Sequence, residues 1–213
     1  MAITFYYGSG SPFSWKVWLA LEHKQLPYAL NVLRLQQAEQ KTPEYLTINP
    51  RGKVPALVDD GFIIWDSTAI VEYLEERYPA HPMLSRNLHE RASARRVVAE
   101  ANQHLYPVLR RLLEQTLFRS DGGGEVAEIA LALRDVQREL NFFEEALHGD
   151  YFSGPLSLAD FSLYPMLALI KRVHNKQPQH ATGALLGSKL VTFMQRIEQL
   201  PYFTKTFPPH WIK

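Results

Sequence analysis

The sequence predicts an α/β domain followed by an all-helical domain. Over residues 1–80, strand-like and helical apolar runs follow one another in the order β-α-β-α-β-β-α, which is the order of a compact α/β domain. Beyond them no strand-like run appears, and apolar residues recur at helical spacing. Pro79 and Pro82 mark the connection. We therefore expect domains at residues 1–80 and 86–213, with a linker at about 79–87.

The first domain is expected to begin with a strand, a helix and a second strand. Residues 3–7 are β-branched or aromatic, and the glycines and serines that follow end this strand. Pro12 stands near the first turn of a helix over residues 13–24, where a missing N–H is tolerated. Residues 28–33 form the second predicted strand.

A hairpin and a helix are expected to complete this domain. Residues 54–58 and 62–65 are apolar and flank an Asp-Gly pair, which is a strong turn signal and predicts an antiparallel hairpin. Residues 66–78 carry apolar side chains at helical spacing. A short helix fits near residues 43–46.

The second domain contains four helical patterns, at residues 88–118, 125–147, 157–173 and 185–200. In the pattern at 125–147 the apolar residues alternate by three and four positions, which is typical of a helix face packed on a core. Pro107 lies inside the first long helix and is expected to kink it.

The composition excludes several classes of site and partner. With 23 basic and 22 acidic side chains, the chain is not expected to bind nucleic acid or an anionic membrane. The absence of cysteine removes disulfides, thiolate metal sites and cysteine nucleophiles. The eight histidines include no i,i+4 pair that could hold a metal on one helix face, so no metal is expected.

The sequence also points to a location. Its first residues lack the basic and apolar regions of a secretory signal. Its most apolar stretch, residues 163–170, is too short to cross a bilayer. The cytosol is therefore the expected location.

Two local signals suggest a ligand site. Proline cannot donate to a sheet ladder, and a cis Val54-Pro55 bond at a strand start would turn the Val54 backbone outwards to pair with an extended peptide. An ordinary trans proline is the alternative that the spacing leaves open. Asp66-Ser67 begins a helix, and such a helix end can receive a ligand carboxylate while Asp66 accepts from an ammonium group. Helix capping alone is the other interpretation.

The third signal is the loop at residues 8–14, which follows the first strand and leads into a helix. Its hydroxyl groups stand where helix N–H groups concentrate positive potential. A thiolate held there would accept a hydrogen bond from a hydroxyl group, and this stabilisation of the charged form lowers the pKa of the thiol. Serine and glycine are also ordinary turn residues.

Four segments resemble the cytosolic glutathione S-transferases. They are residues 11–17 (SPFSWKV), 49–57 (NPRGKVPAL), 66–70 (DSTAI) and 157–160 (SLAD), the last also being a capping box by itself. The four segments occur in the order and at the spacing found in this family, and together they span nearly the whole chain. The resemblance implies a thioredoxin-like, glutathione-binding N-terminal domain and an all-α C-terminal domain, and it is closest to the serine-type classes, among them theta, zeta and tau.

The resemblance also implies roles for individual residues. Ser11 would donate a hydrogen bond to the glutathione sulfur, and Val54, before a cis Pro55, would pair with the cysteinyl backbone. Lys41 and Lys53 would stand near the glycine carboxylate. The γ-glutamyl end would be held by Asp66 and Ser67. Other hydroxyls that could replace Ser11 are those of Ser9, Ser14, Tyr6 and Tyr7.

The implied reaction is conjugation of glutathione to a small hydrophobic electrophile by a homodimeric transferase of the detoxification type. The expected acceptor pocket contains Phe13, His104, Val108 and Arg111, with the aromatic tail at residues 207–211 as a cover. The alternatives are a non-enzymatic glutathione-binding protein and a glutathione-dependent isomerase or dehalogenase. Where the zeta class has Ser-Ser-Cys, this chain has Ser11-Pro12-Phe13, which weakens the case for maleylacetoacetate isomerisation. Classes that use a nucleophilic cysteine are excluded.

Overall fold

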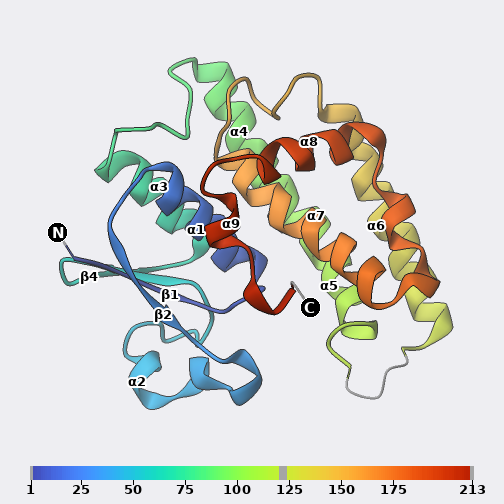
Figure 1. Ribbon diagram of the computed structural model, residues 1–213, viewed down its shortest axis with the longest axis horizontal. Coiled ribbons are helices and arrows are strands. Elements are labelled where there is room, and N and C mark those ends of the chain that lie inside the picture. The colour runs from blue at the N-terminus through green and yellow to red at the C-terminus, as the bar shows by residue number, and fades with distance from the viewer. Residues whose placement is uncertain (1, 120–123, 212–213) are drawn as a thin grey trace. The chain divides into compact units, whose positions relative to one another are not determined.

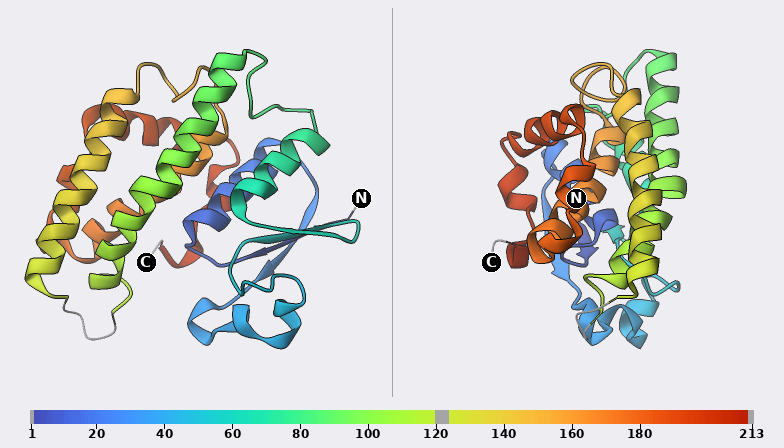
Figure 2. Two further views of the ribbon diagram at one scale, coloured as in Figure 1. Left: turned by 180° about the vertical axis from the view of Figure 1, so that it is seen from behind. Right: turned by 90° about the vertical axis from the view of Figure 1, so that its right-hand side faces the viewer.

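The computed structural model describes residues 2–119 and 124–211 of the chain. Contacts divide these into two compact units: residues 2–84 with 201–211 form the first, and the described residues from 85 to 200 form the second. Each unit is shown in Figures 1 and 2. The first contains a four-stranded mixed sheet with helices, and the described part of the second is all helical, which confirms the predicted thioredoxin-like and all-α fold classes.

The sheet of the first unit has the strand order β2-β1-β3-β4. Its strands are β1 (Ile3–Tyr7), β2 (Tyr28–Val32), β3 (Ala56–Asp59) and β4 (Phe62–Trp65). Strand β1 pairs in parallel with β2, to which it is connected through α1, and in antiparallel with β3. Strands β3 and β4 form the predicted hairpin, with Asp59 opposite Phe62.

Two helices cover one face of this sheet, α1 (Pro12–His23) and α3 (Ser67–Arg77), and the short α2 (Pro43–Leu46) lies towards the other face (Figures 1 and 2). The core between the sheet and the two helices is apolar and shielded from solvent. Its fully buried residues include Phe5, Val17, Leu57, Ile70 and Leu74.

The predicted strand over residues 54–58 begins later than expected. Its ladder with β1 and β4 starts at Ala56, because Pro55 has no N–H to donate and follows a cis peptide bond. Val54 therefore stands outside the ladder, just before the sheet.

The predicted helix over 88–118 is helical without interruption from Leu88 to Gln115. A π-helical turn divides it into two α-helices and directly precedes Pro107, the residue at which the sequence predicts a kink. These elements are α4 (Leu88–Glu100), η3 (Ala101–Leu105) and α5 (Tyr106–Gln115).

Helices α6, α7 and α8 lie close to their predicted positions, whereas the short helices named below with them had no counterpart in the sequence analysis. In the second unit the remaining elements are α6 (Val126–Ala146), α7 (Leu158–Lys176), α8 (Ser188–Glu198), η4 (Pro178–His180) and η5 (Thr182–Leu185). In the first unit the remaining short helices are η1 (Leu35–Gln37), η2 (Glu39–Lys41), α9 (Phe203–Thr206) and η6 (Pro209–Trp211).

Helix α7 begins with the predicted capping box. Asp160 is fully buried, and its carboxylate accepts from the Ser157 N–H at 2.7 Å, the Ser157 hydroxyl at 2.9 Å and the Phe152 N–H at 3.0 Å. These donors would otherwise be buried without acceptors, so the carboxylate fixes the start of the central helix of this unit.

The end of the chain returns to the first unit. The Trp15 indole of α1 donates to Thr206 Oγ1 at 2.9 Å, and the same ring contacts Phe207 and Trp211 edge-on. The sequence analysis instead assigned residues 201–211 to the helical domain, because their contacts with α1 leave no local pattern. Within the described residues, no helix combines the length and the apolar character needed to span a membrane.

Candidate functional site

Three predicted site segments meet at one end of the strands, which we call the sheet edge below. Ala56, at the start of β3, pairs with Tyr6 near the end of β1 and with Trp65 at the end of β4. The loop after β1, the segment before β3 and the residues after β4 therefore lie at the same end of the sheet. The structure thus brings together Ser11, Val54-Pro55 and Asp66-Ser67.

Ser11 is the N-cap of α1. Its backbone is extended, and its Oγ accepts a hydrogen bond from the Ser14 N–H at 3.3 Å. Because that contact uses a lone pair of the oxygen, the hydroxyl proton remains available to another acceptor. The helix N-terminus adds positive potential at the same point. This arrangement can stabilise an anion beside Ser11.

The alternative hydroxyls have other surroundings. Ser14 is buried, and its Oγ accepts from the Gly8 N–H at 3.3 Å, which closes the loop. Ser9 Oγ lies 3.1 Å from His210 Nδ1. Tyr7 is buried on the core side, where desolvation raises the pKa of its phenol, and Tyr6 packs its ring near that of Tyr45. Among these residues Ser11 alone is a helix N-cap.

The Val54-Pro55 bond is cis, as the resemblance implied. A small network fixes the residues before it: the Lys53 carbonyl accepts from the Tyr45 hydroxyl and from the Asn49 side-chain amide, both at 2.7 Å. The buried Asn49 also accepts from the Arg51 N–H at 3.0 Å through its side-chain oxygen. The sequence analysis gave Tyr45 and Asn49 no role, although Asn49 lies inside a quoted motif.

The two predicted lysines flank the same turn. Lys41 Nζ donates to the Arg51 carbonyl at 3.4 Å, and the Lys53 side chain is exposed. Gly52 between them has φ +57, and a Cβ there would stand 2.9 Å from both the Gln40 carbonyl and Lys41 Nζ. Only glycine fits, and its close approach keeps Lys41 beside the turn.

Asp66 and Ser67 begin helix α3. Asp66 is the N-cap, and its Oδ1 accepts from the N–H groups of Thr68 at 2.9 Å and Ala69 at 3.2 Å. Its φ of 74° is uncommon for a residue other than glycine and marks a constrained turn. Ser67, the first helical residue, is buried. Capping and ligand binding are thus compatible, because the cap uses one oxygen of the carboxylate.

Lys16 is a further charged residue of this region. Its ammonium donates to Thr68 Oγ1 at 3.2 Å and lies 5.9 Å from the centre of the Phe13 ring. Burial lowers the pKa of Lys16 to about 8, and the negative charge of Asp66 opposes this shift. The sequence analysis includes Lys16 only as part of the segment 11–17 and gives it no role, because helical periodicity at residues 13–24 does not reveal that a lysine is buried.

The residues predicted for the acceptor pocket belong to both units. Phe13 lies in the first turn of α1 and is half-buried. The others are on the second unit, where His104 is exposed in η3, Val108 is half-buried in α5, and Arg111 of α5 forms an ion pair with Asp135 of α6. A pocket that they share stays a prediction.

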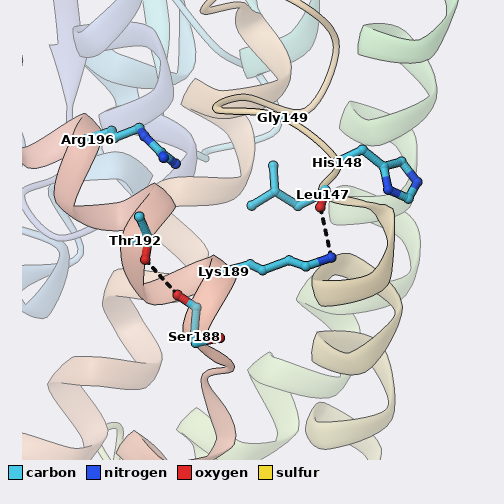
Figure 3. Close-up of a pocket in the computed structure, with 7 residues that line it drawn as sticks. All are labelled: Leu147, His148, Gly149, Ser188, Lys189, Thr192 and Arg196. Carbon is cyan, nitrogen blue, oxygen red and sulfur yellow. Dashed lines mark hydrogen bonds between the residues drawn. The ribbon is translucent and has the colours of Figure 1, made fainter.

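A different cavity, of about 380 Å³, lies within the second unit (Figure 3). Its cationic groups already have partners, since Lys189 donates to the Leu147 carbonyl at 3.1 Å and Arg196 pairs with Asp150 at 2.9 Å. None of the predicted site residues lines it. The lining residues are Leu147, His148, Gly149, Ser188, Lys189, Thr192 and Arg196.

Known proteins resemble this chain over most of its length. A family model described as the N-terminal domain of glutathione S-transferase matches residues 10–77, which include the three segments at the sheet edge. A zeta-class glutathione S-transferase from Euphorbia esula is 46% identical over 198 residues, covering 93% of this chain and 86% of that protein. A probable maleylacetoacetate isomerase 2 from Drosophila melanogaster is 33% identical, covering 77% of this chain and 72% of that protein.

Two solved structures have the same fold as this chain. A glutathione S-transferase from the Antarctic clam Laternula elliptica superimposes with a TM-score of 0.81 at 27% identity, covering 100% of this chain and 95% of that one. A glutathione transferase from Pseudomonas putida, solved with glutathione disulfide bound, has a TM-score of 0.84 at 18% identity, covering 96% of this chain and 90% of that one.

Proposed function

Because this chain belongs to the glutathione S-transferase family, we propose that it joins the sulfur of glutathione to a carbon of a small apolar electrophile. The observation that carries the proposal is the meeting of Ser11, Val54-Pro55 and Asp66-Ser67 at one sheet edge. These segments offer a hydroxyl for the sulfur, a backbone segment for the peptide and a helix end for a carboxylate.

Activation of the thiol is the first step. A free thiol with a pKa of about 8.5 is only a few per cent ionised at pH 7. Lowering this pKa by about two units requires about 2.7 kcal/mol of preferential stabilisation of the thiolate. A hydrogen bond from Ser11 to the sulfur and the field at the start of α1 can supply this amount together.

The remaining groups orient the tripeptide. Val54 would pair with the cysteinyl backbone, Asp66 and Ser67 would hold the γ-glutamyl end, and Lys41 and Lys53 would stand near the glycine carboxylate. The network on the Lys53 carbonyl supports this assignment, because it fixes the backbone next to Val54. The thiolate then attacks the electrophilic carbon, the leaving group departs with its electron pair, and the thiol proton has already passed to solvent.

A second function has specific support. Relatives from Dictyostelium discoideum and Drosophila melanogaster, 29% and 33% identical, are named maleylacetoacetate isomerase and probable maleylacetoacetate isomerase 2. A glutathione-dependent isomerase would use the same thiolate on a different acceptor. Pro12 and Phe13 replace the Ser and Cys of the zeta signature, and for this reason we favour conjugation.

The proposal is tested with glutathione and a chlorodinitrobenzene-type acceptor, with maleylacetoacetate in a parallel assay. We expect conjugation by the native protein, and Ser11→Ala should abolish it while glutathione binding, measured by calorimetry, is largely kept. If Tyr6→Phe abolished conjugation and Ser11→Ala did not, the residue that activates the thiol would be Tyr6 and not Ser11.

Ser9→Ala is the matched control, because Ser9 belongs to the same loop and its hydroxyl faces His210. It should retain conjugation. Binding without turnover of either acceptor would favour the non-enzymatic alternative, and no heat of binding with millimolar glutathione would overturn the proposal.

A further inference from the structure

Two lysines of α1 and its C-cap are buried in different surroundings. Lys24, the C-cap of the helix, is 3% exposed, and Lys16, in its second turn, is 1% exposed. The Lys24 ammonium pairs with Glu75 at 2.8 Å and donates to the Tyr78 carbonyl at 2.7 Å, with the carbonyls of Ala80 and His81 at 3.4 and 3.5 Å. The charge of Lys24 is therefore compensated within the protein.

Lys16 has far less compensation. Its three N–H donors have one hydrogen-bond acceptor, Thr68 Oγ1, and the remaining close group is the Phe13 ring. In the part of the chain that the structure describes, no carboxylate lies within ion-pairing distance of this ammonium. Asp66 acts on it from farther away, while its Oδ1 is occupied by the start of α3. A buried charge with so few partners is costly for the unliganded protein.

The position of Lys16 indicates what compensates it. Side chains of a helix lean towards its N-terminus, so Lys16 extends from the second turn of α1 towards Phe13 and Thr68, near the first turns of α1 and α3. Both helix ends carry partial positive charge. An ammonium beside two such ends raises the positive potential of the site further, which favours an anion there.

We propose that Lys16 is a positioning residue for glutathione, whose γ-glutamyl carboxylate at the start of α3 supplies the negative charge that the buried ammonium lacks. The inference rests on the proposed function, because it assumes that glutathione binds at this sheet edge. Lys16 acts through the electrostatic potential and through its hydrogen bond to Thr68, which joins the two helices that hold the ligand.

Calorimetry with S-methylglutathione tests this role separately from thiol chemistry, because this ligand keeps the carboxylates and has no ionisable thiol. Lys16→Met should weaken its binding by about tenfold, because the variant loses the electrostatic attraction of a nearby buried charge for the carboxylate of the ligand. Lys16→Arg should restore most of the affinity. In turnover assays Lys16→Met should raise KM for glutathione more than it lowers kcat.

Lys24→Met is the matched control, since it removes an equally buried ammonium from the C-cap of the same helix. It should lower the melting temperature and leave the affinity of the folded protein for S-methylglutathione unchanged. Equal affinity of Lys16→Met and the native protein would overturn the role of Lys16. Failure of the native protein to bind would instead overturn the proposed function.

A measurement on the native protein covers the case in which Lys16→Met does not fold. Nitrogen-15 spectra of the lysine side chains should show a shift of the Lys16 ammonium signal on addition of S-methylglutathione, whereas the Lys24 signal should stay in place. Binding that leaves the Lys16 signal unmoved would contradict the proposal.

Discussion

At the scale of single residues, the loop before α1 contains several hydroxyl groups with distinct tasks. Ser14 is buried and accepts from Gly8, so it holds the loop closed. Ser11 caps the helix with a lone pair and keeps its proton for a ligand. The same residue type thus serves folding at one position and is suited to thiolate binding three residues earlier.

Gly52 gives a prediction about the glutathione site. In Gly52→Ala the new methyl group would stand 2.9 Å from the Gln40 carbonyl and from Lys41 Nζ, at a φ that already disfavours alanine. We expect a loss of stability above about 1 kcal/mol, and weaker glutathione binding because Lys41 is displaced. Chemical denaturation and calorimetry measure both effects.

Gly61→Ala provides the comparison for this variant. Gly61 also has positive φ, at +89, but a Cβ there meets nothing within 4 Å. It should lose stability through backbone strain alone, by about 1 kcal/mol, with unchanged glutathione affinity. If Gly52→Ala and Gly61→Ala gave the same stability and the same glutathione affinity, the close contacts at Gly52 would contribute to neither property.

Asp160 gives a prediction about pH. Burial raises its pKa from 3.8 to about 6, although its hydrogen bonds from Phe152 and Ser157 act in the opposite direction. Since the folded-state pKa lies above the unfolded value, the contribution of Asp160 to stability is fully present below about pH 4 and is lost as the pH rises through about 6.

The measurement is urea denaturation of the native protein and Asp160→Asn across this range. The stability advantage of the native protein over the variant should be larger at low pH than at neutral pH, by up to about 3 kcal/mol for a shift of about two pKa units. A difference that did not change with pH would contradict the raised pKa.

The sequence indicates those candidate site residues that form local patterns. A proline before a strand and an aspartate before a helix are visible within a few residues, and the structure confirms the cis Val54-Pro55 bond and the N-cap at Asp66. The support of Lys53 by Tyr45 and Asn49, and the burial of Lys16 against Thr68, arise from tertiary packing. No local signal could have found them.

At the scale of elements, periodic helices were predicted to within a few residues, and the errors have local causes. The predicted start of β3 is two residues too early, because Val54 and Pro55 are apolar but do not take part in the hydrogen-bonded ladder, which begins at Ala56. Between α4 and α5 the sequence predicts a kink at Pro107, and the structure has a π-helical turn directly before this residue, which a local pattern does not reveal.

The contact between α1 and α9 gives a prediction at this scale. Thr206→Val keeps the side-chain shape but leaves the buried Trp15 N–H without its acceptor. We expect the free energy of unfolding to fall by about 1–3 kcal/mol. Chemical denaturation monitored by tryptophan fluorescence measures this change. Thr204→Val, at an exposed position of the same helix, should change stability by less than about 0.5 kcal/mol. Equal effects of the two variants would refute the role of this hydrogen bond.

At the scale of the whole molecule, the expected homodimer requires an interaction surface, and β4 exposes large apolar side chains. Phe62 is 53% exposed, and Ile63 and Trp65 are also exposed on the same edge strand, with the Phe62 ring 5.2 Å from that of Tyr73 on α3. Large apolar side chains that are exposed together on one strand are typical of interaction surfaces. We therefore expect β4 to contribute to the interface of the homodimer that the resemblance implies.

Light scattering after size-exclusion chromatography tests this expectation. The native protein should be a dimer at micromolar concentration, and Phe62→Glu should shift it towards monomer. Leu30→Glu is the control, because Leu30 is 45% exposed on β2 at the opposite edge of the sheet, and it should remain dimeric. A monomeric native protein would contradict the homodimer.

The return of residues 201–211 to the first unit has a consequence for biosynthesis. The first unit needs both the beginning and the end of the chain, whereas the second is made of one continuous stretch. Until residues 201–211 have been synthesised, Trp15 has no Thr206 to bind. The helical unit, although it follows most of the first unit in the sequence, can thus be completed before the first unit receives its last segment.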